Sequence, residues 1–213
     1  MKIKGLIFDL DGVIVSTETN HFDAWSAIAE KLSIEFNEAD NEKIKGLSRS
    51  DSLDVICDLG SVQLTHYDKL EYLELKNKIY LHSIQSLNTD DLLPGVLHLL
   101  KQAKKKDLKL ALGSSSKNAK YILQKLFITD YFDVIIDGND VDFPKPDPEV
   151  FLKGAKGMGL NVADIVVFED AESGILAAQT GGFYAVAVGN RKLKNCADKY
   201  IDNLGEFLLE NYE

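Results

Sequence analysis

The sequence has little cysteine and no excess of positive charge, and each shortage excludes a class of protein. Cys57 and Cys196 are the only two cysteines, and their separation matches no metal-binding or redox motif. A net charge of −10 argues against nucleic acid and against an anionic membrane surface, because both bind basic faces. A small phosphorylated substrate is compatible with this charge, since it needs only local positive groups. We therefore expect reduced, structural thiols in a cytoplasmic protein.

Long apolar segments are also scarce. The stretch 173–190 carries no charge and approaches transmembrane length, but it contains Gln179 and the pair Gly181-Gly182, and its pattern changes halfway. Such a pattern indicates the end of a helix, a turn and a strand rather than a membrane span. The apolar run near the N-terminus is too short for a signal peptide, because Asp9 interrupts it. No membrane partner is expected.

What the chain does contain is an alternation of strand and helix patterns. With 213 residues, 45% of them apolar, it can bury a sizeable core. From residue 93 onward strands and helices alternate, which predicts an α/β fold with a doubly wound, mostly parallel, Rossmann-like sheet. Residues 16–92 show only helical periodicity. We expect a core of residues 1–15 and 93–213, with an inserted all-helical domain at 16–92 and a hinge at each end.

The individual elements follow from local periodicity and turn residues. Strands are expected at 5–9, 108–112, 134–136, 164–168 and 184–188, with a weak one at 200–201. Core helices are expected at 96–105, 118–126, 148–158 and 173–180, with a terminal helix at 204–211. Helices of the insertion are expected around 21–32, 41–45, 51–59 and 66–84.

Two aspartates end the first strand pattern. The apolar run Gly5–Phe8 stops at Asp9, and Asp11-Gly12 follows. Side chains two positions apart on an extended segment point the same way, and two such carboxylates repel unless a cation lies between them or one holds a proton. Gly12 lets the backbone turn away just beyond them. Alone, the pair is more typical of a strand that ends in a polar turn.

Three further polar sites follow strand patterns: Ser114–Asn118, Lys145 and Glu169-Asp170. Each has an ordinary alternative, as a helix N-cap at Ser116, as a surface lysine among three prolines, or as acids at a helix start. A cis bond before Pro146 is left open by the sequence. In an open parallel sheet, however, loops at the carboxyl ends of the strands converge on one crevice. Four such loops together are hard to explain as solvent-facing turns.

The order of these motifs resembles the haloacid dehalogenase (HAD) superfamily of phosphotransferases. The likeness covers nearly the whole chain, and the helical insertion after the first motif is similar to the cap domain of that superfamily. Within it, the chain is most similar to the β-phosphoglucomutase family, through the segments 8–14, 45–49, 114–118 and 168–170. The resemblance implies an enzyme acting on a small phosphorylated sugar.

The resemblance also implies a role for each motif. Asp9 would be the nucleophile that forms an aspartyl-phosphate, and Asp11 the general acid and base. Lys145 and Ser114 would hold the phosphoryl oxygens. Mg²⁺ would be the cofactor, since charge on a phosphoryl group must be neutralised for transfer, with oxygen ligands from Asp9, the backbone carbonyl of Asp11 and Asp170. Glu169 would be either a further ligand or an acceptor behind the ligands. Contacts with the substrate or its phosphate are implied for Thr17, His21, Arg49, Lys76, Ser116, Lys117 and Asn118.

Some of these residues have plainer interpretations on spacing alone. Arg49 on a helical block is typical of a solvated side chain, and His21 on an apolar helical face is typical of a core histidine. By resemblance, Arg49 and the segment 116–118 grip the far phosphate of a bisphosphorylated sugar, for which the planar guanidinium is well suited. Ser16 departs from the acid expected beside Thr17, which bears on the hinge.

Two functions are therefore considered. The first is an isomerase that interconverts β-D-glucose 1-phosphate and D-glucose 6-phosphate through a phospho-aspartate and a 1,6-bisphosphate. The second is a Mg²⁺-dependent phosphatase, in which water discharges the phospho-aspartate. The motifs around Asp9 do not separate the two, whereas Arg49 and Asn118 favour the isomerase because it needs two phosphate sites. A monomer is compatible with the sequence, which does not reveal the oligomeric state.

Overall fold

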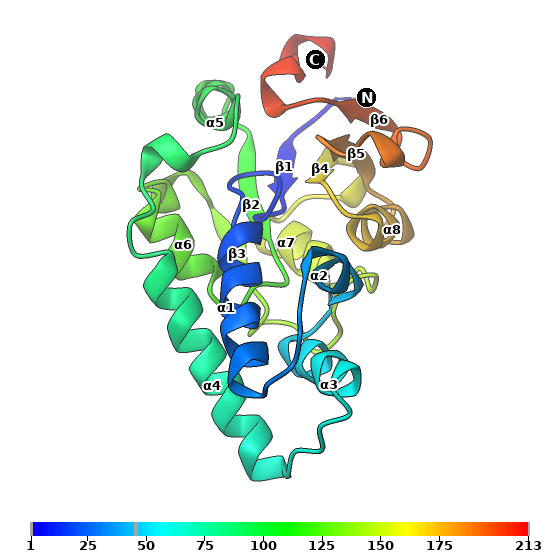
Figure 1. Cartoon of the computed structure of the whole chain (residues 1–213). Coiled ribbons are helices and arrows are strands. Elements are labelled where there is room, and N and C mark those ends of the chain that lie inside the picture. The colour runs from blue at the N-terminus through cyan, green and yellow to red at the C-terminus, as the bar shows by residue number, and fades with distance from the viewer. Residues whose placement is uncertain (1, 45–46, 213) are drawn as a thin grey trace. The chain divides into compact units, whose positions relative to one another are not determined.

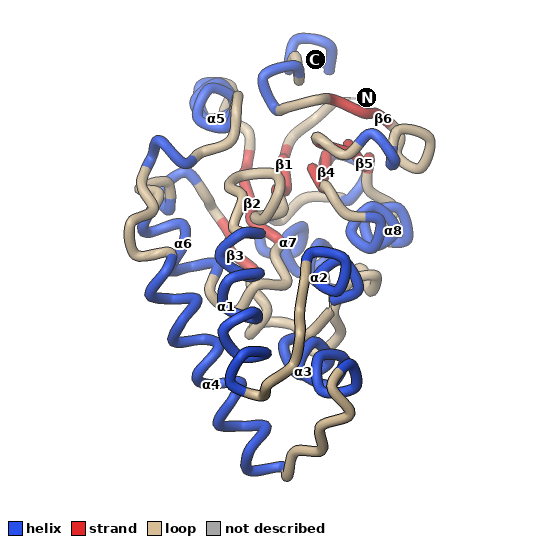
Figure 2. The backbone as a smooth tube through the Cα atoms, viewed as in Figure 1, coloured by secondary structure: helices blue, strands red, loops and turns tan. Residues whose placement is uncertain are grey.

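The computed structural model describes residues 2–44 and 47–212, which divide into two compact units (Figure 1). The first unit contains residues 1–16 and 87–213, and the second contains residues 17–86. The first is built on a sheet covered by helices, and in its described part the second contains helices as its only regular elements (Figure 2). No helix within the described residues is both long and apolar enough to cross a membrane.

The sheet has six strands, all parallel, in the order β3-β2-β1-β4-β5-β6. Its strands are β1 (Gly5–Phe8), β2 (Lys109–Gly113), β3 (Val134–Ile136), β4 (Ile165–Glu169), β5 (Tyr184–Val188) and β6 (Lys199–Ile201). The chain winds outward from β1 in one direction and then returns to continue from β4 in the other. At such a reversal, here between β1 and β4, open α/β sheets bind ligands beyond the carboxyl ends of the strands.

The central strands β1 and β4 are buried along their whole length because both faces of the sheet are covered. Ile7 and Val167 belong to one cluster with residues of α7 (Glu149–Met158) and α8 (Glu172–Thr180). Phe8 and Phe168 stack with ring centroids 5.0 Å apart, and Phe168 also meets Phe207 edge to face. The remaining helices of this unit are α5 (Val96–Lys105) and α6 (Ala119–Lys125).

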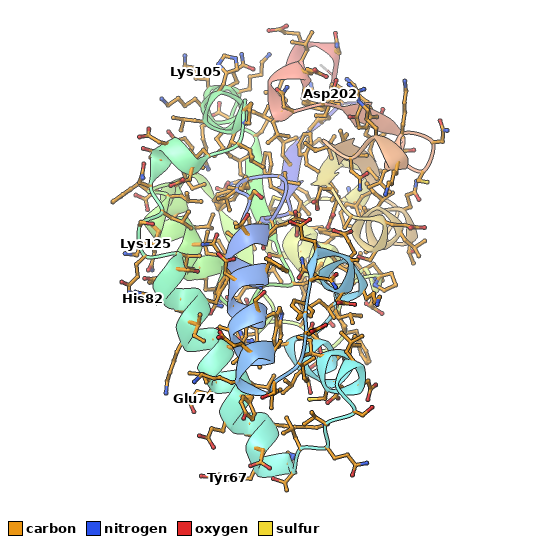
Figure 3. All side chains as sticks on the ribbon, in the orientation of Figure 1. Tyr67, Glu74, His82, Lys105, Lys125 and Asp202 are labelled. Carbon is orange, nitrogen blue, oxygen red and sulfur yellow. The ribbon has the colours of Figure 1, made fainter. Side chains whose placement is uncertain are left out.

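The helical unit contains α1 (Glu18–Lys31), α2 (Glu38–Ile44), α3 (Arg49–Leu59) and α4 (His66–Ser83). Its core is a cluster that includes Trp25, Ile28, Leu53 and Ile56. On the exposed side of α4, Tyr67, Glu74 and His82 point away from the ribbon (Figure 3). The helix expected around 41–45 is present up to Ile44, and Lys45 lies outside the described residues.

The prediction of a terminal helix at 204–211 is wrong. Two short 3-10 turns occupy this segment, Leu204–Glu206 and Leu209–Tyr212, and Phe207 between them has an extended backbone. Leu204, Phe207 and Leu209 are all buried, and this spacing of three and then two residues does not fit one face of an α-helix. Packing against the sheet therefore overrides the local helical preference here.

Candidate active site

Lys145 joins three strand ends of the sheet unit. Its Nζ donates hydrogen bonds to Asp9 Oδ1 at 2.5 Å, to Glu169 Oε1 at 2.5 Å and to the carbonyl of Gly113 at 3.1 Å. Asp9 directly follows β1, Glu169 ends β4 and Gly113 ends β2. All three charged side chains are nearly buried, with 10% or less of each exposed. Three of the predicted site residues, Asp9, Lys145 and Glu169, thus meet in one place.

The peptide bond before Pro146, which the sequence left open, is cis. Lys145 precedes this proline in a segment that also contains Pro144 and Pro148. Its ammonium lies 4.7 Å from the ring centroid of Phe151 on α7, in addition to the two carboxylates. Lys145 is therefore a buried, fixed cation and not a surface loop residue.

Three carboxylates gather at this place. Asp9, Glu169 and Asp170 each offer an oxygen, and these oxygens lie within 4.8 Å of one another. Burial first of all raises the pKa of Asp9, with Lys145 opposing and Glu169 and Asp170 adding to the rise. Burial, Glu169 and Asp11 raise the pKa of Asp170 to about 7. The cluster therefore has an excess of negative charge that one ammonium does not relieve, and its hard oxygen donors fit a divalent cation such as Mg²⁺.

The charge of Lys145 is stable in this setting. Burial lowers the pKa of its ammonium, but the adjacent carboxylates of Asp9 and Glu169 outweigh burial and raise the pKa above its ordinary value. The group therefore stays protonated at neutral pH. It can neutralise a phosphoryl oxygen next to Asp9 without taking or giving a proton.

Asp11 and Gly12 form the turn that follows Asp9. The Gly12 N–H donates to the carbonyl of Val15 at 2.8 Å, and Gly12 has a φ of 76°. A Cβ at this position would lie 1.9 Å from Asp170 Oδ2. Glycine is thus needed here both for its backbone conformation and for the close approach of Asp170. The half-buried Asp11 lies near enough to Asp170 for its charge to affect that group.

The Ser114–Asn118 segment leaves the neighbouring strand β2. Ser114 is buried, its N–H donates to the carbonyl of Ile136, and its Oγ accepts the N–H of Ser116 at 3.0 Å. Ser116 Oγ in turn accepts the N–H of Asn118 at 3.3 Å, and Asn118 is the N-cap residue of α6 without a side-chain cap bond. Ser116 therefore organises the turn before α6 but is not its N-cap. The side chain of Lys117 is exposed.

Glu169 contacts both the start of α8 and Lys145. Its Oε2 accepts the N–H groups of Asp170 and Ala171, both at 3.0 Å, at the start of α8, while its Oε1 accepts from Lys145. A Cβ on Gly174 would lie 1.9 Å from the Glu169 carboxyl group, so α8 has room for this side chain only because residue 174 is glycine.

Sequence reasoning missed Gly174 and also Asn190. Asn190 follows β5, and its Nδ2 donates to the carbonyl of Asp170 at 2.9 Å. Asn190 therefore marks a fifth polar site after a strand end. The expectation that loops at the carboxyl ends of parallel strands converge could have identified it. Gly174 carries no such signal, because its importance depends on which side chain approaches it.

The residues assigned to the helical unit form a polar group within that unit. Lys76 Nζ lies 2.8 Å from His21 Nδ1, and the Tyr80 hydroxyl donates to Thr17 Oγ1 at 3.1 Å. The His21 ring packs on Tyr80 with centroids 4.1 Å apart, and Lys76 Nζ lies 4.9 Å from the ring centroids of both Trp25 and Tyr80. His21 is thus not a plain core histidine, since it accepts a hydrogen bond from a buried ammonium.

Burial, together with the neighbouring positive charges, determines the protonation state of His21. Burial, then Lys76, then Arg49 lower the pKa of His21 to about 3. The imidazole is therefore neutral at physiological pH. Arg49, the first residue of α3, is half-buried, and burial lowers the pKa of its guanidinium, which remains charged. Lys45 and Gly46 belong to the segment 45–49, which is one of those that carry the family resemblance, and they lie outside the described residues.

The comparisons with known proteins identify the family. The model of the haloacid dehalogenase-like hydrolases matches residues 3–182. The chain belongs to this family. It is accordingly an enzyme, a HAD-type phosphotransferase with the parallel α/β fold of that family.

Relatives within the HAD family include both mutases and phosphatases. The chain is 41% identical to a β-phosphoglucomutase of Bacillus subtilis, over 98% of this chain and 93% of the relative. It is 31% identical to a phosphorylated carbohydrates phosphatase of Thermotoga maritima, over 84% and 82% of the two chains. The crystal structure of a β-phosphoglucomutase from Clostridium difficile matches with a TM-score of 0.91 and 37% identity, covering 98% and 95%.

Proposed function

We propose that this protein is an isomerase that interconverts β-D-glucose 1-phosphate and D-glucose 6-phosphate. The observation that carries the proposal is the 41% identity to a β-phosphoglucomutase over 98% of the chain, together with a carboxylate at residue 9 held by Lys145 in a buried site. The similarity to a sugar-phosphate phosphatase is lower, at 31%. The substrate would be a small phosphorylated sugar.

The reaction would proceed in two balanced transfers. Asp11 takes the proton from the free C6 hydroxyl of β-glucose 1-phosphate, and that oxygen attacks phospho-Asp9, so that the bond from phosphorus to Asp9 breaks and the 1,6-bisphosphate forms. After the bisphosphate has turned, a carboxylate oxygen of Asp9 attacks the phosphorus on O1, the bond from phosphorus to O1 breaks, and Asp11 returns the proton to that oxygen, which gives glucose 6-phosphate and phospho-Asp9. Lys145 and Ser114 would hold the phosphoryl oxygens throughout.

Mg²⁺ would be bound by Asp9, Asp170, the backbone carbonyl of Asp11 and Glu169 directly or behind the ligands. When bound, it would neutralise charge on the transferred group and allow a dianionic phosphate to approach a carboxylate. The 2.5 Å contact of Glu169 with Lys145 and its two backbone contacts favour the position behind the ligands. Glu169 would then orient Asp170 and Lys145.

The second phosphate would be bound by Arg49 with Ser116, Lys117 and Asn118. We propose that the helical unit acts as a cap at residues 16–92, with hinges at both ends, and that Thr17, His21 and Lys76 contact the substrate when it closes. The neutral His21 and the ammonium of Lys76 present donors to a sugar or its phosphate. Exclusion of water by closure would favour a sugar hydroxyl over water as the acceptor of the phosphoryl group.

The test supplies β-glucose 1-phosphate, Mg²⁺ and a trace of glucose 1,6-bisphosphate, and measures glucose 6-phosphate and free phosphate separately. The expected result is glucose 6-phosphate with little phosphate release. Rapid release of phosphate without glucose 6-phosphate would instead identify a phosphatase, the second candidate favoured by the phosphatase relative. Asp9→Asn should abolish both activities, and surviving turnover would remove the covalent mechanism.

The proposed role of Arg49 distinguishes the isomerase from the phosphatase. Arg49→Ala should reduce kcat/KM of the isomerase reaction by ~100-fold, because a charge-assisted contact to phosphate is lost, and should leave hydrolysis of p-nitrophenyl phosphate nearly unchanged. Arg191→Ala, which removes an exposed arginine of the sheet unit, is the control. Equal losses in the two assays would contradict a distal-phosphate role.

A further inference from the structure

We infer that the turn of residues 137–140, which follows β3, positions the Ser114–Asn118 loop, with Asn139 as its main positioning residue. The inference rests on the proposed function, since it concerns the loop assigned to the distal phosphate. Neither the motifs nor the family resemblance points to this turn. Its evidence is a set of contacts between two loops that follow adjacent strands, β2 and β3.

Two consecutive residues of the turn hold the backbone of the loop. The Gly138 N–H donates to the carbonyl of Ser116 at 3.2 Å, and Asn139 Nδ2 donates to the carbonyl of Lys117 at 3.0 Å. A Cβ on Gly138 would lie 2.3 Å from the carbonyl oxygen of Ser115. The backbones of the loop and the turn are therefore in close contact at Gly138, and a larger residue at this position would push them apart.

The turn is itself fixed by a buried carboxylate. The Asp137 side chain is 2% exposed, and its Oδ1 accepts both the N–H and the Nδ2 of Asn139, at 2.8 and 3.0 Å. Asp140 Oδ2 accepts the Asp137 N–H at 3.0 Å, and Lys120 Nζ lies 3.3 Å from Asp137 and 3.0 Å from Asp140. These contacts orient Asn139 Nδ2 towards Lys117, since the same amide is shared between Asp137 and the loop.

Within the loop, Ser114 Oγ accepts the Ser116 N–H and Ser116 Oγ accepts the Asn118 N–H. Neither of these two bonds holds the carbonyl of Lys117, to which Asn139 donates. The carboxylate group at Asp9, by contrast, is held independently by Lys145 and Glu169. Loosening the turn should therefore impair the distal phosphate site and leave the chemistry at Asp9 intact. The kinetic signature is a raised KM with little change in kcat.

The test compares Asn139→Ala with Asn195→Ala, which truncates an equally exposed asparagine elsewhere in the same unit. Loss of the bond to Lys117 should raise the KM for β-glucose 1-phosphate about fivefold, the effect of one hydrogen bond. Both kcat and the hydrolysis of p-nitrophenyl phosphate, which has no second phosphate, should stay within about twofold of the original protein. Gly138→Ala should raise the KM further, and Asn195→Ala should change neither constant.

Hydrogen exchange supplies a readout that does not depend on the reaction. Amide exchange at Ser116 and Lys117 should be faster in Asn139→Ala and unchanged in Asn195→Ala. An unchanged KM, or equal losses of kcat in both assays, overturns the inference. If the original protein forms no glucose 6-phosphate, the proposed function fails by itself. Exchange then decides the positioning role, which is overturned if the Ser116 and Lys117 amides are as protected in Asn139→Ala as before.

Discussion

Lys145 balances the charges on which the site depends. Two carboxylates, those of Asp9 and Glu169, lie 2.5 Å from its ammonium, in a place where burial raises the pKa of Asp9. The ammonium opposes this rise in the pKa of Asp9, while Asp170 beside it is a candidate ligand for a divalent cation. A phosphate that binds here would meet positive charge on two sides. This arrangement is what an attack by a carboxylate on a phosphate dianion requires.

Two glycine-to-alanine variants test how tightly the side chains around Lys145 are packed. Gly174→Ala places a methyl group 1.9 Å from the Glu169 carboxyl group, so Glu169 must leave its contacts with Lys145 and the start of α8. We expect a loss of about 1–3 kcal/mol of stability from overpacking, with activity reduced by at least ~10-fold. Gly154→Ala on α7 is the control, since its Cβ would meet nothing closer than 3.2 Å. Denaturant unfolding and turnover measure both effects, and an active, stable Gly174→Ala protein would contradict the assigned packing.

At the scale of elements, Asp133 connects α5, β2 and β3. Its carboxylate accepts the Leu110 N–H at the start of β2 and contacts Lys104 at the end of α5 and Lys109. Its own N–H donates to the carbonyl of Leu110, directly before β3. Burial raises the pKa of Asp133, but the Leu110 N–H and the two lysines outweigh burial and lower the pKa to about 2.

The lowered pKa of Asp133 predicts a pH dependence of stability. Because the folded-state pKa lies below the ordinary value of 3.8, the carboxylate stabilises the fold above about pH 4, and this contribution is lost as the pH falls towards 2. Because solvent screens this exposed group, the contribution amounts to ~1 kcal/mol at neutral pH, less than the full shift would give. Urea unfolding of Asp133→Asn should therefore show a deficit at pH 6 that shrinks below pH 4. Asp130→Asn, at an exposed neighbouring acid, is the control, and a deficit that is constant with pH would refute the assignment.

At the scale of the whole molecule, the two units should respond differently to a divalent cation. The carboxylates of Asp9, Glu169 and Asp170 all belong to the sheet unit. Mg²⁺ at 100 times its dissociation constant should stabilise that unit by ~2.7 kcal/mol, because it binds the folded state. The melting transition of the sheet unit should rise by several degrees, and chelation with EDTA should reverse the rise.

Asp170→Asn separates metal binding from simple charge screening. The substitution removes one charge from a crowded cluster, so the metal-free protein should melt at a higher temperature than the original. It should also lose the rise produced by Mg²⁺, since an amide is a poor replacement for a carboxylate ligand. Asp202→Asn removes an exposed acid and should leave the rise intact. A full Mg²⁺ effect in Asp170→Asn would exclude this residue as a ligand.

The sequence by itself determined most of the elements and the chemical character of the site. The elements 96–105, 134–136 and 184–188 have the predicted bounds, because their hydrophobic periods are unbroken and turn residues flank them. The convergence of Asp9, Lys145 and Glu169 was predictable as well, since parallel strands that alternate with helices bring their carboxyl ends to one edge.

Only the tertiary structure decided how these parts touch. The segment 204–211 has a helical composition, but Phe207 and Leu209 are buried against the sheet in a spacing that no helix provides. Asn139 matters because of the carbonyl of Lys117, which is remote in sequence, and Gly174 matters because the Glu169 side chain turns towards α8. Local periodicity indicates which face of an element is buried. Which residues pack against that face depends on the arrangement of the other elements in space, and the local pattern carries no information about that arrangement.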